Sequence, residues 1–281
     1  MKITLIGASG FIGRHLAAAL RGRGDIVALA SLRDPAAAAQ ACEGSDVVVN
    51  LAGEPVAQRW SAAVKAKIRA SRVAAPRALI DALAELATPP QAYVSASAVG
   101  YYGTSESATF DESSGPGSDF LAEVCVAWEA EADRAAAAGM RVAKIRTGLV
   151  LGTDGGALAK LLPIFKLGGG GPVASGRQWY SWIHVVDQVG IYVHAIDGAD
   201  GVLAATAPVP VRNAEFTRAL AAALHRPAIV PIPAFGMSLV LGEGALVVTQ
   251  GQRVVPTRTL ASGYAFRFPT LDGALAALVR A

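Results

Sequence analysis

Short apolar runs alternate with amphipathic segments through the first 150 residues of the chain. The first run, KITLI at 2–6, is rich in β-branched residues and predicts a strand, and 11–23 then carries apolar residues at helical spacing. The same alternation predicts strands at 26–31, 46–53, 92–97 and 142–151, and helices at 35–42, 61–86 and 118–138. Continuous apolar strands joined by helices are typical of a parallel sheet buried on both faces. The pattern therefore predicts an α/β protein with a doubly wound parallel (Rossmann) sheet.

The pattern of apolar and polar residues changes after about residue 152. A glycine run at 168–172, an aromatic segment at 179–184 and clustered prolines at 208–233 replace the regular alternation, with helices predicted only at 213–224 and 270–279. This half predicts a smaller mixed α/β lobe packed on the sheet. We expect a dinucleotide-binding domain at 1–151, rejoined by 183–206, and a C-terminal substrate or partner lobe at 152–281.

Composition narrows the class of protein. Of the 281 residues 53% are hydrophobic and 17% charged, which suits a large buried core. The net charge of +3 comes from scattered basic residues, so we expect no nucleic-acid partner. No apolar run reaches the roughly 18 residues needed to span a membrane. The two cysteines, Cys42 and Cys125, match no metal-ligand spacing and favour a reduced, cytoplasmic location. A homodimer is compatible with all of this.

The segment GASGFIG directly follows the first strand and opens the first helix. Gly7 permits a tight turn, Gly10 lets the backbone approach a pyrophosphate, and Gly13 lets the helix pack closely on the sheet. The free N–H groups at the start of that helix attract phosphate, and Ser9 adds a hydroxyl. The spacing and its context together predict a dinucleotide-binding site; the alternative is a glycine turn that only packs.

The end of the second strand indicates which dinucleotide is bound. NAD-binding proteins carry an acidic residue there to hold the ribose 2′-hydroxyl. This chain has Ser31 and Arg33 instead, and its only acid, Asp34, comes late. A hydroxyl and a guanidinium suit a 2′-phosphate, so the sequence favours NADP(H) over NAD(H). An exposed Arg33 could equally be a solvated surface charge.

Several segments resemble a known family. The chain is similar to the extended short-chain dehydrogenase/reductases, and more closely to their atypical "epimerase family" subgroup, in the segments GASGFIG, NLAGE (50–54), YVSASAVGYYG (93–103), IRTGLVLG (145–152), SWIHVVD (181–187), APVPVRNAEF (207–216) and RVVPTRTLASGYAFRFPTL (253–271). The resemblance spans nearly the whole chain. It implies a Rossmann fold that binds NADP(H) and a small C-terminal domain, without specifying a substrate.

The resemblance also implies a set of cofactor-binding positions. They are Gly7, Ser9, Gly10, Phe11, Ile12 and Gly13 in the phosphate loop, Ser31 near the adenosine phosphate, Asn50, Leu51, Ala52 and Gly53 in the loop after the fourth strand of the family, Arg72 in the following helix, and Ser95 and Ala96 beneath the nicotinamide. For Arg72 a solvated helix charge is the alternative. The segment 31–46 is shorter than in relatives, which predicts a truncated adenine pocket and weakens the choice between NADP and NAD.

The usual catalytic pair of these enzymes is missing. Relatives carry Tyr-x-x-x-Lys on the helix predicted at 118–138, but no tyrosine here has a lysine four residues later. Counting back from Trp128-Glu129, where relatives often have an acid, places Leu121 and Cys125 at the two positions. Ser97 matches the catalytic serine position of the family. Tyr101 or Tyr102 could act as a relocated acid; ordinary aromatic lining is the alternative.

Other polar residues have structural alternatives of their own. Cys125 could be a nucleophile or a buried thiol, Glu123 a functional acid or a surface charge, and Arg146 a cleft charge or a tie between lobes. Trp179, Tyr180, Trp182 and His184 could frame a pocket with Arg177 and the glycine loop at 168–171. In relatives the stretch around His184 and Asp187 mostly anchors one lobe to the other, so we interpret His184 as structural.

These observations lead to two alternative functions. The first is an NADP(H)-binding oxidoreductase or epimerase-like protein that acts on a small polar, sugar-like substrate through Ser97 and Tyr102. The second is a catalytically silent protein that senses NADP(H) and regulates a partner. The intact glycines are needed for both, and the empty positions of the catalytic pair motivate the second.

Overall fold

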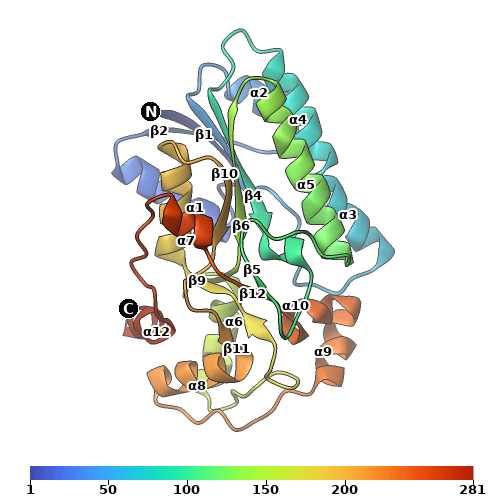
Figure 1. Ribbon diagram of the computed structural model, residues 1–281, viewed down its shortest axis with the longest axis vertical. Helices are drawn as coiled ribbons and strands as arrows, with labels where there is room; N and C mark the ends of the chain where they lie inside the picture. Colours follow the sequence, from blue (N-terminus) through green and yellow to red (C-terminus); the bar gives the residue numbers. More distant parts are fainter. Residues whose placement is uncertain (281) are drawn as a thin grey trace.

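A six-stranded parallel sheet forms the centre of the molecule in the computed structural model, which describes residues 1–280 (Figure 1). Its strands lie in the order β10-β6-β4-β3-β1-β2. Their bounds are Lys2–Ile6 for β1, Ile26–Ala30 for β2, Val47–Asn50 for β3, Ala92–Ala98 for β4, Arg141–Thr147 for β6 and Gly201–Ala205 for β10. The expected strand–helix alternation thus forms one sheet.

The direction of chain winding changes at β1. Leu5 of β1 pairs with Leu29 of β2 on one side and with Val49 of β3 on the other. The connection leaving β1 runs to β2 and the one leaving β3 runs to β4, so they diverge at the carboxyl ends of these adjacent strands. Such a switch point leaves a crevice where ligands bind in open α/β sheets. The fold places the candidate site at this edge.

Helices cover both faces of the sheet. On one face lie α1 (Phe11–Gly22) and α7 (Val185–Ile196); on the other lie α2 (Pro35–Ala41), α3 (Ala62–Arg72), α4 (Ala74–Ala84) and α5 (Phe120–Ala137), as Figure 1 shows. Two cores separate along the same division. Leu5, Leu16 and Ile191 belong to the first, whereas Ile6 and Tyr93 belong to the second. The predicted doubly wound α/β class is confirmed.

The helix expected over 61–86 is two helices. Val73 ends α3 and caps α4, and the chain resumes helical bonding when the N–H of Arg77 donates to the carbonyl of Val73. Pro76 lies in the first turn of α4 and has no N–H to continue a single helix. The break places the side chain of Arg72 at a helix end, beside the sheet edge.

The strand expected over 142–151 also divides. β6 ends at Thr147, and β7 (Leu149–Leu151) leaves the main sheet to pair with β9 (Trp182–His184). Gly148 allows this departure because a Cβ there would lie 2.1 Å from the carbonyl oxygen of Ser181. Only a glycine fits where the two backbones approach so closely.

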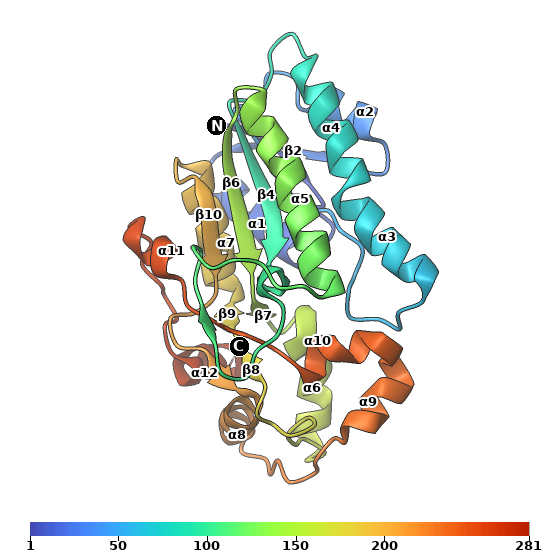
Figure 2. The same ribbon diagram turned by 45° about the vertical axis from the view of Figure 1, so that its right-hand side comes forward.

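The smaller lobe lies beyond the carboxyl edge of the sheet (Figures 1 and 2). Its core gathers Trp182, Phe165, Phe216 and Leu275. Its remaining elements are α6 (Gly156–Lys166), β8 (Trp179–Tyr180), β11 (Val211–Arg212), α8 (Asn213–Leu224), α9 (Ala234–Leu241), η2 (Gly242–Ala245), α10 (Leu246–Thr249) and α12 (Leu271–Arg280).

Three short elements link this lobe to the sheet: β5 (Thr109–Phe110) pairs with β12 (Arg253–Val254), and α11 (Thr257–Ala261) follows. Helices α6 and α7 were not predicted from the sequence, because α6 contains a proline and α7 is apolar around most of its circumference.

Within residues 1–280 no helix combines the length and apolarity that a membrane crossing needs.

Candidate cofactor site and active site

The glycine segment forms a tight turn between β1 and α1. Gly7 has φ +85°, in the left-handed region that favours glycine, and a Cβ there would lie 2.9 Å from the backbone nitrogen of Ala52. At Gly13 a Cβ would lie 2.3 Å from the carbonyl oxygen of Gly7. Both glycines are therefore required by the protein's own packing. At Gly10 the nearest atom, the Gly7 carbonyl oxygen, is 3.3 Å away, so this glycine leaves room for something outside the chain.

The start of α1 offers unused hydrogen-bond donors. Gly10 caps the helix without a side chain, and within residues 1–280 the backbone N–H groups of Phe11, Ile12 and Gly13 have no acceptor. Gly10 and Ser9 are exposed. A helix N-terminus with free N–H groups and a positive dipole end binds anions, and the missing Cβ at Gly10 permits close approach. The residues present therefore fit a dinucleotide pyrophosphate.

Neighbouring loops hold this turn in place. The ring of Phe11 fills the space over Gly152, Gly155 and Gly156, where a Cβ would lie within 2.4–3.1 Å of it. Behind it, Asp154 accepts hydrogen bonds from His15, at 3.0 Å, and from Arg14. The small lobe thus supports the first helix of the Rossmann domain through glycines that leave room for an aromatic ring.

The loop after β3 lies against the glycine turn. Asn50 is fully buried; its Nδ2 donates to the hydroxyl of Tyr93 at 2.9 Å, and its Oδ1 accepts from the N–H of Ala52 at 3.1 Å. These bonds fix the backbone of Leu51 and Ala52 beside Gly7. The expected cofactor segment 50–53 therefore lies next to the phosphate loop, and exposed Gly53 continues along the same edge.

Ser31 and Arg33 follow β2 and are both exposed. The only bond between them joins the Arg33 N–H to the Ser31 Oγ over 3.4 Å. β2 is the edge strand of the sheet, and the shortened segment after it holds only α2, which Asp34 caps through the N–H of Ala37. Both side chains are thus accessible at the carboxyl end of the second strand.

Ser97 and Tyr102 point into the protein and share a buried ion pair. Ser97 Oγ donates to Glu129 Oε1 at 2.6 Å, and Arg146 binds both oxygens of Glu129, at 2.8 and 2.9 Å. Arg146 also donates to the hydroxyl of Tyr102 at 3.0 Å and stacks over Tyr101 with its Cζ 3.5 Å from the ring centroid. Exposed fractions are 3% for Ser97, Tyr102 and Arg146, and 5% for Glu129.

This environment changes the chemistry expected of these groups. Burial raises the pKa of Tyr102 to about 12, although the charge of Arg146 opposes the shift, so the phenol stays protonated at neutral pH. Arg146 is neither an open cleft charge nor a tie between lobes; it joins β6 to α5 and to the 3₁₀ turn Val99–Tyr102.

Of the residues expected under the nicotinamide, Ser95 is buried and donates to the Ala96 carbonyl. Catalysis by Ser97 and Tyr102 stays a prediction.

The positions of the missing pair are apolar in the structure as well. Cys125 is buried, burial raises its thiol pKa to about 12, and Leu121 packs against Gly100. The thiol is therefore a poor nucleophile. Glu123 lies on the same helix, two residues from each of them, and is exposed, as expected for a surface charge.

The sequence analysis used Glu129 only to align the helix with relatives and did not predict that it pairs with Arg146 and accepts from Ser97. The sequence did hold a signal: Glu129 lies four residues after Cys125 and three before Ala132, on the buried stripe of α5. An acid on the apolar stripe of a helix needs a buried partner. Glu112 was also missed; it is buried and accepts from the backbone N–H groups of Ala204, Arg258 and Thr259.

The structure distributes the aromatic segment 179–184 among separate environments. Trp179 has the guanidinium groups of Arg212 and Arg253 against its ring, Tyr180 packs on Phe216, and Trp182 is in the core of the small lobe. These side chains therefore do not frame one common pocket, because alternate residues of β8 and β9 face different layers.

His184 has a structural environment. Its Nδ1 accepts from the N–H of Val186 and so caps α7, its ring stacks on Phe268 at 3.9 Å, and Asp187 accepts from the N–H groups of Arg267 and Phe268. Burial lowers the pKa of His184 to about 4. The neutral ring is the form that can accept the capping bond.

A pH dependence of stability follows from His184. Because its pKa is lower in the folded than in the unfolded state, we expect the free energy of unfolding to fall by about 2 kcal/mol as pH drops from 6.5 to 4. Urea titrations across this range would measure it. His184→Asn keeps a capping acceptor without titrating, so its profile should be flatter; parallel profiles would contradict the assignment.

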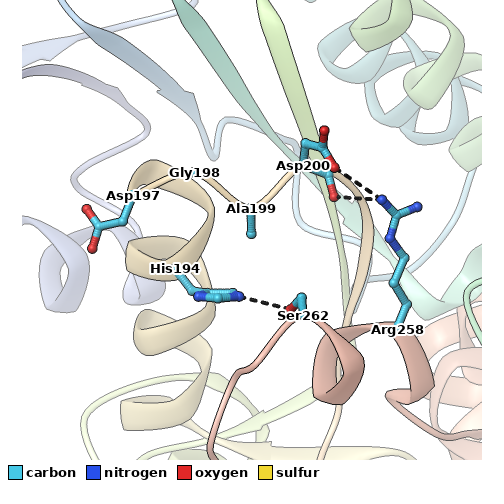
Figure 3. A pocket seen from close by; sticks show the side chains of 7 residues that line it. All are labelled: His194, Asp197, Gly198, Ala199, Asp200, Arg258 and Ser262. Atoms are coloured by element: carbon cyan, nitrogen blue, oxygen red, sulfur yellow. Dashed lines mark hydrogen bonds and ion pairs between the residues drawn. The ribbon is translucent and has the colours of Figure 1, made fainter.

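A cavity of about 400 Å³ lies at the amino-terminal end of β10, away from the carboxyl ends of the strands (Figure 3). Its polar side chains already have partners, since Arg258 binds Asp200, Arg23 binds Asp197, and His194 forms a hydrogen bond with Ser262. It is lined by His194, Asp197, Gly198, Ala199, Asp200, Arg258 and Ser262. The cavity is therefore separate from the carboxyl edge and its phosphate loop.

The parallel sheet, the switch point at β1 and the glycine turn with free N–H groups define a dinucleotide-binding Rossmann protein. Comparison with known proteins agrees. The NAD dependent epimerase/dehydratase family model matches residues 3–205, and the "Domain of unknown function (DUF1731)" matches 232–278. The chain belongs to the NAD-dependent epimerase/dehydratase family.

Relatives match the chain over nearly its whole length. The chain is 41% identical to the chloroplastic homolog of epimerase family protein SDR39U1 from Arabidopsis thaliana, over 100% of this chain and 87% of that protein. It is 35% identical to the epimerase family protein YfhF of Bacillus subtilis, over 99% and 98%. The crystal structure of human SDR39U1 (isoform 2) with NADPH superposes with a TM-score of 0.92 at 35% identity, covering 100% and 99% of the chains. The resemblance drawn from the sequence is confirmed.

Proposed function

We propose that the chain binds NADP(H) at the carboxyl edge of the sheet, with the pyrophosphate at the N-terminus of α1. The observation that carries this proposal is the set of three N–H groups beside exposed Gly10 that have no acceptor in the part of the chain that the structure describes. The human relative crystallised with NADPH supports the same cofactor. Ser9 and the loop Asn50–Gly53 would line the dinucleotide, and Ser95 and Ala96 would lie beneath the nicotinamide end.

The preference for NADP(H) is proposed to come from Ser31 and Arg33, which are exposed at the end of β2 without an acidic neighbour on that strand. Changing Ser31 to Asp should weaken NADPH binding about tenfold or more, because a carboxylate repels the 2′-phosphate, and should leave NADH affinity equal or higher. Calorimetric titrations with both cofactors measure this. The Asp34→Asn variant is the matched control, since Asp34 caps α2; an unchanged NADPH/NADH ratio in the Ser31 variant would argue against the assignment.

We further propose that the protein is an oxidoreductase or epimerase-like enzyme for a small polar, sugar-like substrate. The nicotinamide, when bound, supplies hydride transfer. Among the chain's own residues, Ser97 and Tyr102 are the proposed polar groups, held by the Glu129–Arg146 pair at the end of β4. Reduced cofactor mixed with a panel of carbonyl compounds tests this through loss of nicotinamide absorbance. Turnover that disappears in Tyr102→Phe, with unchanged stability, would support chemistry at this position.

A silent NADP(H)-sensing protein is the second candidate. It is favoured by the burial of Ser97 and Tyr102 in an ion-pair network and by the apolar Leu121 and Cys125. Tight NADPH binding without turnover of any compound, together with a partner recovered only in the presence of cofactor, would favour sensing. A cytoplasmic location and a homodimer are further proposals, which fractionation and light scattering would test.

A further inference from the structure

The helix that carries the lysine in related enzymes has no cation at the positions of the missing pair here. Leu121 and Cys125 occupy the two positions, and a Cβ added at Gly100 would lie 3.5 and 3.9 Å from them. In dehydrogenases of this class the lysine ammonium serves the cofactor ribose beside the nicotinamide. The chain must supply that charge from another element, or do without it.

Arg72, at the end of α3, extends its guanidinium toward this place. A Cβ at Gly53 would lie 3.0 Å from its Nη2, and the Arg72 Cζ lies 5.0 Å from the ring centroid of Trp128, one turn beyond Cys125 on α5. The guanidinium thus lies between the cofactor loop after β3 and the helix of the missing pair. Its charge also acts on the Cys125 thiol, opposing the rise in pKa that burial causes.

The hydrogen bonding of this arginine is incomplete. Its Nη1 donates to the carbonyl of Glu54 at 2.9 Å and, over longer distances, to the Ile68 carbonyl and the Ser71 hydroxyl. Within residues 1–280 its Nε and Nη2 have no acceptor and no carboxylate lies within 4.0 Å of it. Trp128 is buried, and its Nε1 also has no partner in that part of the chain. A sheltered cation and a buried N–H without acceptors are costly, so adjacent donors of this kind point to a ligand rich in oxygen.

We infer that Arg72 replaces the missing lysine as a fixed positive charge, with its free Nε and Nη2 groups donating to hydroxyl oxygens of the nicotinamide ribose. This inference rests on the proposed binding of NADP(H). An arginine keeps its proton throughout the physiological range, so it orients and polarises its partner without relaying protons. Arg72 is in this sense a cofactor-positioning residue, and its effect on binding is independent of pH.

The test is NADPH affinity at two pH values. Arg72→Met should weaken binding about ten- to hundredfold at both pH 6.5 and pH 9.5, because charge-assisted hydrogen bonds are lost. Arg72→Lys should bind nearly as wild type at pH 6.5 and more weakly at pH 9.5, since a sheltered ammonium has a lowered pKa. Wild-type affinity should differ little between the two values. Arg69→Met, an exposed cation on the same helix, is the control.

The outcomes separate the two levels of the proposal. If wild-type protein fails to bind NADPH, the proposed function fails. If wild type binds and Arg72→Met binds equally well, or Arg72→Lys shows no dependence on pH, the role assigned to Arg72 is overturned. Thermal unfolding of each variant without cofactor identifies loss of folding. If the methionine variant does not fold, the pH dependence of NADPH binding by the lysine variant, which keeps a donor for the Glu54 carbonyl, tests the role of Arg72.

Discussion

Replacing Gly10 with aspartate is expected to weaken NADPH binding at least about a hundredfold while leaving the fold intact, because a carboxylate would meet the pyrophosphate and such like-charge contacts cost several kcal/mol. The backbone at Gly10 is extended (φ −71°, ψ 168°), and a Cβ there meets only the Gly7 carbonyl oxygen at 3.3 Å. Aspartate is also a favourable residue at the start of a helix, so the protein without cofactor should be as stable as wild type or slightly more stable. Calorimetric titration and thermal unfolding measure the two effects.

Gly22 supplies the matched control. It lies at the far end of the same helix, with no atom within 4 Å of an added Cβ. Gly22→Asp therefore adds the same carboxylate to α1 without bringing it near the phosphate loop, and NADPH affinity should stay within about twofold of wild type. Should Gly10→Asp bind NADPH as well as Gly22→Asp does, the pyrophosphate does not lie at the N-terminus of α1.

Replacing Arg146 with methionine should lower the free energy of unfolding by about 3–5 kcal/mol, because it leaves the carboxylate of Glu129 buried without its cation. The Tyr102 hydroxyl would lose its Arg146 donor as well. Urea denaturation at pH 7 measures the change. The double variant with Glu129→Gln should recover part of the loss, since both charges are then removed together.

An exposed ion pair provides the comparison. Arg258 and Asp200 lie 3.2 Å apart with side chains that are 51% and 63% exposed, so Arg258→Met should cost less than about 1 kcal/mol. Equal losses in Arg146→Met and Arg258→Met would mean that the Glu129–Arg146 pair is solvated, and Ser97 and Tyr102 would then be accessible for chemistry.

Much of the Rossmann half could be predicted from local sequence. The period of the apolar residues predicts β1, α1 and β4 because each element buries one face or both, and GASGFIG predicts a phosphate site because only glycines tolerate the turn at Gly7 and the contact at Gly13. Predictions failed where a single residue redirects the chain. Pro76 divides one predicted helix, and Gly148 sends β7 toward the small lobe.

The candidate active site depended on contacts that no local pattern contains. Ser97 and Glu129 are 32 residues apart, and Tyr102 and Arg146 are 44 apart. Whether a serine or tyrosine at the end of a strand faces solvent or a buried ion pair depends on the helix packed against it, and that packing is a property of the whole fold.

The sequence by itself determined the alternation of strands and helices, the position of the phosphate loop and the loss of the Tyr-x-x-x-Lys pair, because backbone propensity, periodicity and residue identity are local properties. Only the tertiary structure decided that Ser97 and Tyr102 are bound to the Glu129–Arg146 pair and that Arg72 lies beside Cys125 and Trp128. Burial and hydrogen-bond partners come from segments far apart in the chain, and the free energy of a buried charge depends on those partners.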